Sequence, residues 1–233
     1  MKTIAIITAA GKGKRMGLGI KKPYITLGGK PILAHTVLPF EQSNTINSII
    51  ILTAKGDEDF CSKKIVKRFG FKKVIKIING GKERQDSVMS GIMAAGNGWD
   101  MVVVHDGVRP FVTKEIIEKI VKSADRYGAA ILAAPVKDTI KQTSSGFVKE
   151  TIKRDELWAV QTPQAFRFDM LKRAHEFAKK QGFIGTDDSI LVERLGCKVA
   201  ITNGSYDNIK ITTPEDLMLG EAILKSKKKQ VKV

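Results

Sequence analysis

The sequence predicts an α/β fold, a doubly wound and mostly parallel sheet with a protruding β-hairpin arm. Short apolar runs rich in β-branched residues recur along the chain, amphipathic segments of helical length separate them, and one polar stretch interrupts the alternation. Buried strands that alternate with helices favour βαβ crossovers, which place helices on both faces of a parallel sheet. The 233 residues can bury a substantial core, and we expect a single domain over 1–233.

Each predicted element follows from its own residues. The buried strands are predicted where the short apolar runs lie, over 3–8, 48–53, 74–78, 101–105, 129–136 and 198–202. The helices are predicted where apolar residues recur with helical spacing, near 31–42, 57–69, 83–96, 114–127, 168–181, 187–195 and 214–226. Ligands of such sheets bind beyond the carboxyl ends of the strands, so the residues after each run are the candidate site.

The stretch 137–160 breaks this order. It contains two short alternating segments around Ser144-Ser145-Gly146, which indicates a hairpin rather than a crossover helix. A hairpin that leaves a doubly wound sheet is often an oligomerisation arm. We therefore expect a dimerisation arm at about residues 137–160.

Charge and composition narrow the function classes. The chain has 40 Lys and Arg against 24 Asp and Glu, a net charge of +16, so a basic nucleic-acid-binding protein is one alternative. The basic residues are scattered, however, and aromatic residues make up only 6% of the chain, so nucleic acid is not the expected partner. The cysteines, Cys61 and Cys197, form no CxxC pair, which argues against a disulfide framework or a zinc site.

Nothing in the sequence indicates a membrane protein. No run of about 18 apolar residues occurs, and the apolar stretch near the start is too short for a signal peptide with the usual flanks. The expected location is the cytoplasm.

A glycine-rich basic loop follows the first predicted strand, reading Ala9-Ala10-Gly11-Lys12-Gly13-Lys14-Arg15-Met16-Gly17. The dinucleotide-binding fingerprint requires a glycine where Met16 stands, and no GxxxxGK[ST] string occurs. The glycines allow backbone N–H groups to approach a triphosphate, and Arg15 with Lys22 can supply cations. The alternative is a flexible basic turn.

Asp106 is the strongest acidic candidate, because it follows the run 101–105 at the carboxyl edge of the sheet. It could bind Mg²⁺ or a substrate hydroxyl, or simply pair with Arg109. The histidines are too dispersed for a nucleophilic triad, and His105 at the end of an apolar strand is interpreted as structural.

Several blocks, in order along most of the chain, resemble the cytidylyltransferases of the nonmevalonate isoprenoid pathway, which join CTP to 2-C-methyl-D-erythritol 4-phosphate. They are residues 9–16, Lys22 with Tyr24, Gly80-Gly81-Lys82-Glu83-Arg84-Gln85-Asp86-Ser87-Val88, His105-Asp106-Gly107-Val108-Arg109-Pro110, Ala134-Pro135-Val136-Lys137-Asp138-Thr139, Thr162-Pro163-Gln164 and Asp207-Asn208-Ile209-Lys210-Ile211-Thr212.

Two questions stay open in this resemblance. The family usually has Pro-Lys-Gln-Tyr where this chain reads Lys21-Lys22-Pro23-Tyr24, so Lys21 is a rival to Lys22. The related ribitol 5-phosphate cytidylyltransferases share the first loop and the His-Asp block but tend to differ at residues 84–88. That block favours the methylerythritol substrate, with ribitol 5-phosphate as the alternative.

The resemblance implies a role for each matching residue. Arg15 and Lys22 would stabilise the transition state. The nucleotide would be bound by Ala9, Ala10, Gly11, Gly13, Gly80, Gly81, Ser87, Asp106 and Gly107, with Mg²⁺ as the cofactor and Asp106 as its ligand. The sugar phosphate would be positioned by Arg154, Lys210, Thr139, Thr162 and Arg109. The arm would cross a homodimer, so that Arg154 and Thr139 act in the partner's site.

Two other polar segments have an ordinary interpretation from the residues alone. Lys82-Glu83-Arg84 is interpreted as a charged first helical turn. Thr186-Asp187-Asp188-Ser189 is interpreted as a helix cap followed by carboxylates of the first turn, not as a direct part of catalysis.

Overall fold

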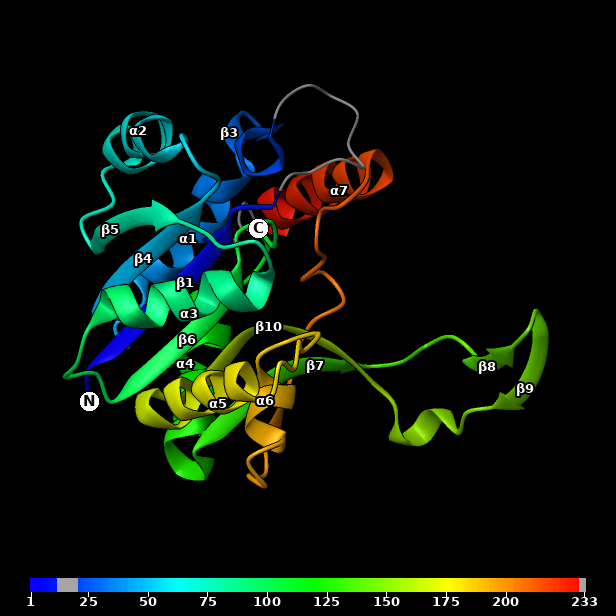
Figure 1. Cartoon of the computed structure of the whole chain (residues 1–233). Helices are drawn as coiled ribbons and strands as arrows, with labels where there is room; N and C mark the ends of the chain where they lie inside the picture. The colour runs from blue at the N-terminus through cyan, green and yellow to red at the C-terminus, as the bar shows by residue number, and fades with distance from the viewer. Residues whose placement is uncertain (12–20, 231–233) are drawn as a thin grey trace.

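Figure 1 shows a computed structural model of the chain, which describes residues 1–11 and 21–230. Its centre is a seven-stranded sheet in the order β11-β7-β10-β6-β1-β4-β5. The strands are β1 (Thr3–Ala9), β4 (Ser48–Thr53), β5 (Val74–Asn79), β6 (Met101–Asp106), β7 (Ala129–Pro135), β10 (Trp158–Arg167) and β11 (Ala200–Asn203). Every pairing in this sheet is parallel except those of β10, which runs antiparallel to both β6 and β7. The predicted doubly wound, mostly parallel sheet is confirmed.

The helices lie where the sequence predicts them. They are α1 (Ile32–Gln42), α2 (Glu58–Cys61) continued by the π-helical segment η3 (Ser62–Lys67), α3 (Arg84–Ala95), α4 (Lys114–Tyr127), α5 (Phe168–Lys180), α6 (Ser189–Glu193) and α7 (Pro214–Gln230). Short elements that the sequence did not predict are the 3₁₀ turns η2 (Lys22–Tyr24) and η4 (Arg154–Glu156) and the small pair β2 (Thr26–Leu27) and β3 (Lys30–Pro31). Of these, η2 and η4 contain the predicted site residues Lys22 and Arg154.

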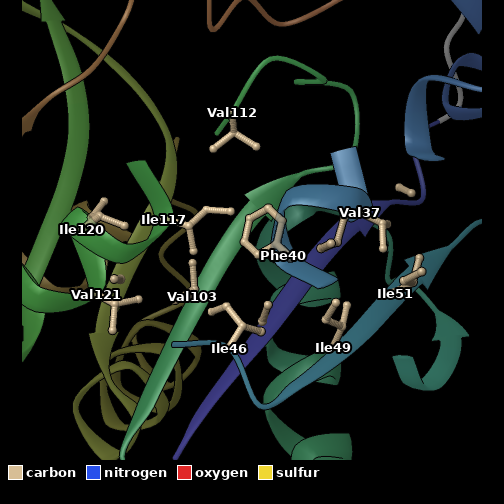
Figure 2. Close-up of a cluster of buried hydrophobic side chains, with 14 of the residues drawn as sticks. Val37, Phe40, Ile46, Ile49, Ile51, Val103, Val112, Ile117, Ile120 and Val121 are labelled. Carbon is tan, nitrogen blue, oxygen red and sulfur yellow. The ribbon is translucent and has the colours of Figure 1, made fainter. Parts of the chain in front are cut away.

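Alternating side chains of the strands build a core on each face of the sheet. In β1, Ala5 and Ile7 pack against α1 and α4, whereas Ile4 and Ile6 pack against α3 and α5. Figure 2 shows the first of these cores, where Phe40 of α1 and the isoleucines and valines of α4 meet β6 and β4. Successive side chains of a strand point to opposite faces, so two cores fix the sheet and leave its carboxyl edge open.

The arm consists of β8 (Lys141–Ser144) and β9 (Phe147–Thr151), which form a separate antiparallel pair. Ser145 and Gly146 between them both have positive φ, the backbone conformation that a two-residue hairpin turn requires. Figure 1 shows the pair projecting away from the sheet and its helices. The predicted hairpin is confirmed.

Strand β10 is a correction to the sequence analysis. Residues 158–160, which the sequence placed in the arm, are its first residues and pair with the end of β7. Gln161, Thr162 and Pro163 interrupt the apolar pattern of this segment, and the register of β10 on β7 shifts between Gln161 and Gln164. Because β10 runs antiparallel, its first half lies at the carboxyl edge of its neighbours.

Candidate active site

A pocket of about 620 Å³ lies at the carboxyl edge of the sheet. It is lined by parts of the chain that are far apart in sequence, namely Thr8, Ala9, Ala10, Gly11, Lys22, Pro23, Gly81, Lys82, Glu83, Arg84, Ser87, Asp106, Val108, Lys210 and Thr212. The end of β1, the turn before α3 and the end of β6 therefore meet where ligands of parallel sheets bind. Gly13 and Arg15 lie outside the described residues.

Two of the predicted nucleotide-binding glycines, Gly80 and Gly81, are packed too closely for a side chain, whereas Gly11 has open space around it. A Cβ on Gly80 would lie 2.4 Å from the Cβ of Ala10 and 2.8 Å from Oγ of Ser87. The N–H of Gly81 donates to Oγ of Ser87 at 3.0 Å, and this hydroxyl donates in turn to the carbonyl of Glu83 at 3.0 Å. The close approach of Gly80 to Ala10 brings the turn before α3 against the end of β1, so the turn forms a close-packed wall of the pocket.

Gly107 has a similar reason to be glycine. Its N–H donates to the carbonyl of Thr8 at 2.8 Å, and a Cβ would lie 3.0 Å from that same oxygen. The hydroxyl of Thr36 in α1 donates to its carbonyl at 3.1 Å. Gly107 thus ties the chain after β6 to β1 and helps to fix Asp106, the residue before it.

The two rival lysines point to different places. Lys22 is 9% exposed and lines the pocket beside Ala10 and Gly11. Lys21 lies outside this lining, and its Nζ is 2.5 Å from Oδ1 of Asp57, the residue before α2. The geometry therefore favours Lys22 as the cation that meets a ligand in this pocket.

Asp106, the last residue of β6, is surrounded by cations. Its Oδ2 lies 2.9 Å from Nζ of Lys210 and 3.5 Å from Nε of Arg109, and its Oδ1 lies 3.2 Å from Nε of Arg84. Burial alone would raise the pKa of Asp106, but the charges of Arg84, Lys210 and Arg109 outweigh burial and hold the pKa well below its ordinary value. The ion pair with Arg109, which was the alternative for Asp106, is present together with two further cations, Arg84 and Lys210.

A second pocket, of about 410 Å³, lies on the other side of this cluster. It is lined by Arg109, Thr162 and the segment around Thr186, and it shares Arg84, Asp106 and Lys210 with the first pocket. The three shared side chains form the boundary between the pockets. Such a boundary can present positive charge to two anionic ligands at once.

Thr162 and His105 form a directed chain of hydrogen bonds behind Asp106. The N–H of Asp106 donates to Oγ1 of Thr162 at 3.0 Å, and Oγ1 lies 3.0 Å from Nδ1 of His105. Nε2 of His105 lies 3.2 Å from the carbonyl of Arg109, which can only accept, so Nε2 carries the proton and the hydroxyl donates to Nδ1. Burial lowers the pKa of His105 to about 4, in agreement with its structural interpretation.

The loop that carries Lys210 is held by a buried amide. Asn208 is 0% exposed, and its Nδ2 donates to Oε1 of Gln161 at 3.1 Å and to the carbonyl of Thr162 at 2.9 Å. The backbone carbonyl of Asn208 accepts from Nη1 of Arg109 at 2.8 Å. Asn208 was quoted within a sequence block but given no role, and the structure makes it the link between β10 and Lys210.

Two predicted substrate-positioning residues lie on the arm, away from both pockets of their own chain. Thr139 and Arg154 are exposed, and Nη1 of Arg154 donates to the carbonyl of Lys137 at 2.7 Å. Arg154 lines a separate hollow with Trp158 at the base of the arm, and that hollow shares no described residue with either pocket around Asp106. Within one chain, the structure does not bring Thr139 and Arg154 to Asp106.

The ordinary interpretations of these two segments hold, because Arg84 begins α3 and Oδ1 of Asp187 accepts from the N–H of Ile190 at 3.2 Å, but Arg84 and Asp188 have further contacts. Arg84 joins two carboxylates, with Nε near Asp106 and Nη1 at 2.6 Å from Oδ2 of Asp188. Asp188 precedes α6 but makes no side-chain cap hydrogen bond, and its carboxylate is buried. One sequence signal for Arg84 was available, because a cation at the first position of a helix faces the positive end of the helix dipole.

Among the described residues, no helix is both long and apolar enough to cross a membrane. Within the same described residues, no three His, Cys, Asp or Glu side chains gather closely enough to hold a metal ion.

Comparisons with known proteins agree on one family. The family model described as IspD, 2-C-methyl-D-erythritol 4-phosphate cytidylyltransferase, matches residues 3–226. Proteins of that name from Alkaliphilus metalliredigens and Geotalea uraniireducens are 50% and 47% identical to the chain, each over 97% of the chain and over 95% and 98% of their own lengths.

Solved structures give the same result. The crystal structure of 4-diphosphocytidyl-2C-methyl-D-erythritol synthase from Anaerococcus prevotii superposes with a TM-score of 0.86 at 34% identity, covering 96% of each chain. That of 2-C-methyl-D-erythritol 4-phosphate cytidylyltransferase from Thermus thermophilus superposes with a TM-score of 0.78 at 30% identity, covering 94% of this chain and 98% of that one.

Proposed function

The chain belongs to the 2-C-methyl-D-erythritol 4-phosphate cytidylyltransferase family, and from that premise we propose how its residues divide the reaction among them. The enzyme transfers the cytidylyl group of CTP to 2-C-methyl-D-erythritol 4-phosphate in isoprenoid synthesis. A phosphate oxygen of the sugar alcohol forms a bond to the α-phosphorus, the bond from that phosphorus to the β-phosphate oxygen breaks, and pyrophosphate leaves.

The larger pocket receives CTP in this proposal. Its backbone at Ala10 and Gly11 and its close-packed turn at Gly81 offer N–H groups to phosphates and base, and Ser87 retains acceptor capacity beside them. Lys22, almost buried in the same wall, places a positive charge where phosphate charge grows in the transition state. We assign Arg15, which lies outside the described residues, the same role from its match to the nucleotide-binding block of the family. Neither cation has to remove a proton, because the attacking phosphate is already ionised near neutral pH.

The second pocket receives the sugar phosphate. Lys210 and Arg109 supply charge for the phosphate, and Thr162 fixes the backbone of Asp106 between the two ligands. The shared boundary at Asp106 supports this division most strongly, because an in-line transfer needs two polyanions to meet across one set of cations.

We also propose that Mg²⁺ enters with CTP and has Asp106 as its protein ligand. Mg²⁺ in nucleotide sites takes one or two carboxylates in addition to phosphate oxygens, so a single carboxylate fits. The Lys210 side chain is 41% exposed, which allows it to leave Oδ2 of Asp106 for a phosphate. When bound, Mg²⁺ would neutralise charge on the triphosphate.

The arm supports a homodimer. All residues of β8 and β9 are exposed in the single chain, and Phe147 is 79% exposed at the tip. Exposed apolar side chains on a projecting hairpin favour an interface, and a two-fold axis would carry Arg154 and Thr139 to the partner's second pocket. A single domain over 1–233 and a cytoplasmic location stay predictions from the sequence.

The test of substrate is release of pyrophosphate from CTP and Mg²⁺ with 2-C-methyl-D-erythritol 4-phosphate or ribitol 5-phosphate, with ATP in place of CTP as the nucleotide control. Turnover is expected with CTP and the methylerythritol phosphate. Turnover with ribitol 5-phosphate alone would refute the assignment of the sugar substrate, and equal turnover with ATP would refute the role of the pocket wall at Gly81 and Ser87 in base selection.

A further inference from the structure

A buried contact between a carboxylate and an imidazole lies behind the boundary between the two pockets. The side chains of Asp188 and His175 are each 1% exposed, and Oδ1 of Asp188 lies 3.2 Å from Nε2 of His175. The other oxygen of Asp188 accepts from Nη1 of Arg84 at 2.6 Å. Asp188 lines neither pocket around Asp106, so it has no direct access to a ligand there.

Arg84 connects the side chain of Asp188 to the site, because it bonds to both Asp188 and Asp106. Its guanidinium is planar, so fixing Nη1 on Asp188 also fixes the direction of the Nε–H bond toward Oδ1 of Asp106, 3.2 Å away. We propose that Asp188, held by His175, is a positioning residue that acts on Asp106 through Arg84. The inference depends on the role of Asp106 proposed above.

The charge balance explains what Asp188 would do. Because Arg84 is shared between two carboxylates, it contacts only Oδ1 of Asp106 and leaves Oδ2 to Lys210 and Arg109. Without the charge of Asp188, the arginine is free to fork across both oxygens of Asp106, which is the geometry that guanidinium and carboxylate prefer. Lys210 would then lose its place, and the cations that meet the sugar phosphate would be misaligned.

The backbone around Asp188 is held by other contacts, so its charge can be changed without removing the loop. Oε1 of Gln164 accepts from the N–H of Asp188 at 3.3 Å, and Nε2 of Gln164 donates to Asp187 at 2.7 Å. Gln85, next to Arg84, donates to the carbonyl of Phe183 at 3.0 Å and accepts from the N–H of Gly185 at 2.9 Å. The carboxylate is therefore free for the arginine.

The test combines Asp188→Asn with Arg84→Met in a double-mutant cycle, with kcat and KM for 2-C-methyl-D-erythritol 4-phosphate as the readout. Asp188→Asn alone should lower kcat/KM about tenfold with a raised KM, the usual cost of losing a partner behind a functional group. In the Arg84→Met background the same change should cost less than about twofold, because the arginine through which it acts is absent. Asp187→Asn is the control for position. Asp187 lines the second pocket and contacts Gln164, Ser189 and Ile190 rather than Arg84, so its cost should be the same with and without Arg84→Met.

A purely structural role predicts a different result. Loss of folded protein would lower kcat in proportion to the active fraction and leave KM unchanged, and its cost would add in full to that of Arg84→Met. Either that result or an unchanged kcat/KM in folded Asp188→Asn overturns the inference. Asp106→Asn separates the two levels. If Asp106→Asn is impaired while Asp188→Asn is normal, only the role inferred for Asp188 is refuted. If Asp106→Asn has normal kinetics, the proposed role of Asp106 is refuted, and the inference about Asp188 fails with it.

A second pair of variants covers the case in which Asp188→Asn does not fold. His175→Phe removes the N–H that faces Asp188, and His175→Gln restores an amide N–H near the same position. His175→Phe should raise KM for the sugar phosphate, and His175→Gln should recover most of the loss. Equal kinetics of the two folded variants would contradict the positioning role.

Discussion

The crossed arm makes a prediction that two inactive proteins can test together. Lys22→Ala removes the buried cation of the CTP pocket, and Arg154→Ala removes the exposed arginine of the arm. The hollow that Arg154 lines shares no described residue with the pocket that Lys22 lines. Each homodimer should be nearly inactive, because every one of its sites has one lesion.

The size of the recovery follows from the symmetry. If the two proteins are unfolded together in equal amounts and refolded, about half of the dimers are mixed. With Arg154 acting in the partner's site, one site of each mixed dimer has both lesions and the other has neither. About a quarter of wild-type activity should therefore return.

The assay is pyrophosphate release, with the fraction of mixed dimers measured by native mass spectrometry. Lys22→Ala mixed with Lys210→Ala is the matched control: both lysines line the same pocket of one chain, so every site of a mixed dimer keeps one lesion and no activity should return. Mixed dimers of the first pair that are no more active than their parents would refute the crossed arm and leave the family assignment intact.

Lys22→Ala and Arg15→Ala should each lower kcat about 100-fold, because lost stabilisation of transition-state charge costs a few kcal/mol. Lys21→Ala should keep a kcat near that of the wild type. If steady-state kinetics show a large loss for Lys21→Ala and a small one for Lys22→Ala, the choice of Lys22 over Lys21 is wrong. Cys61 is 0% exposed, and burial raises the pKa of its thiol to about 12, so at pH 8 it stays protonated and should react with a thiol reagent only after unfolding. The partly exposed Cys197 should react in the native protein, and a fast phase that persists in Cys197→Ser would contradict the burial of Cys61.

The sequence predicted most of the fold from local patterns. The runs at 48–53 and 101–105 became β4 and β6 within one residue, because a fully buried strand must be apolar along its length. Residues 158–167 were missed because polar residues and a proline interrupt the pattern, although two neighbouring strands satisfy the backbone of β10. Hydrogen bonds from neighbouring strands form between backbone groups, so the side-chain pattern of a segment does not predict them.

The site divides in the same way. Ala10, Gly11 and Asp106 were predicted as ligand-binding because each follows a strand, and strand ends meet at one edge of a parallel sheet. The sequence could not decide between Lys21 and Lys22, because the two are adjacent and of the same type. The difference lies in the structure, where Lys21 pairs with Asp57 and Lys22 lines the pocket.

By itself, then, the sequence determined the helices, every strand of the main sheet except β10, and the edge at which ligands bind, because side-chain burial repeats with the period of each element. Only the tertiary structure decided that Arg84 joins Asp106 to Asp188, a residue that lies 104 positions after Arg84 in the chain. Ionic partners are chosen by distance and burial in space, and a charged residue in a sequence looks the same whether it faces water or a buried carboxylate.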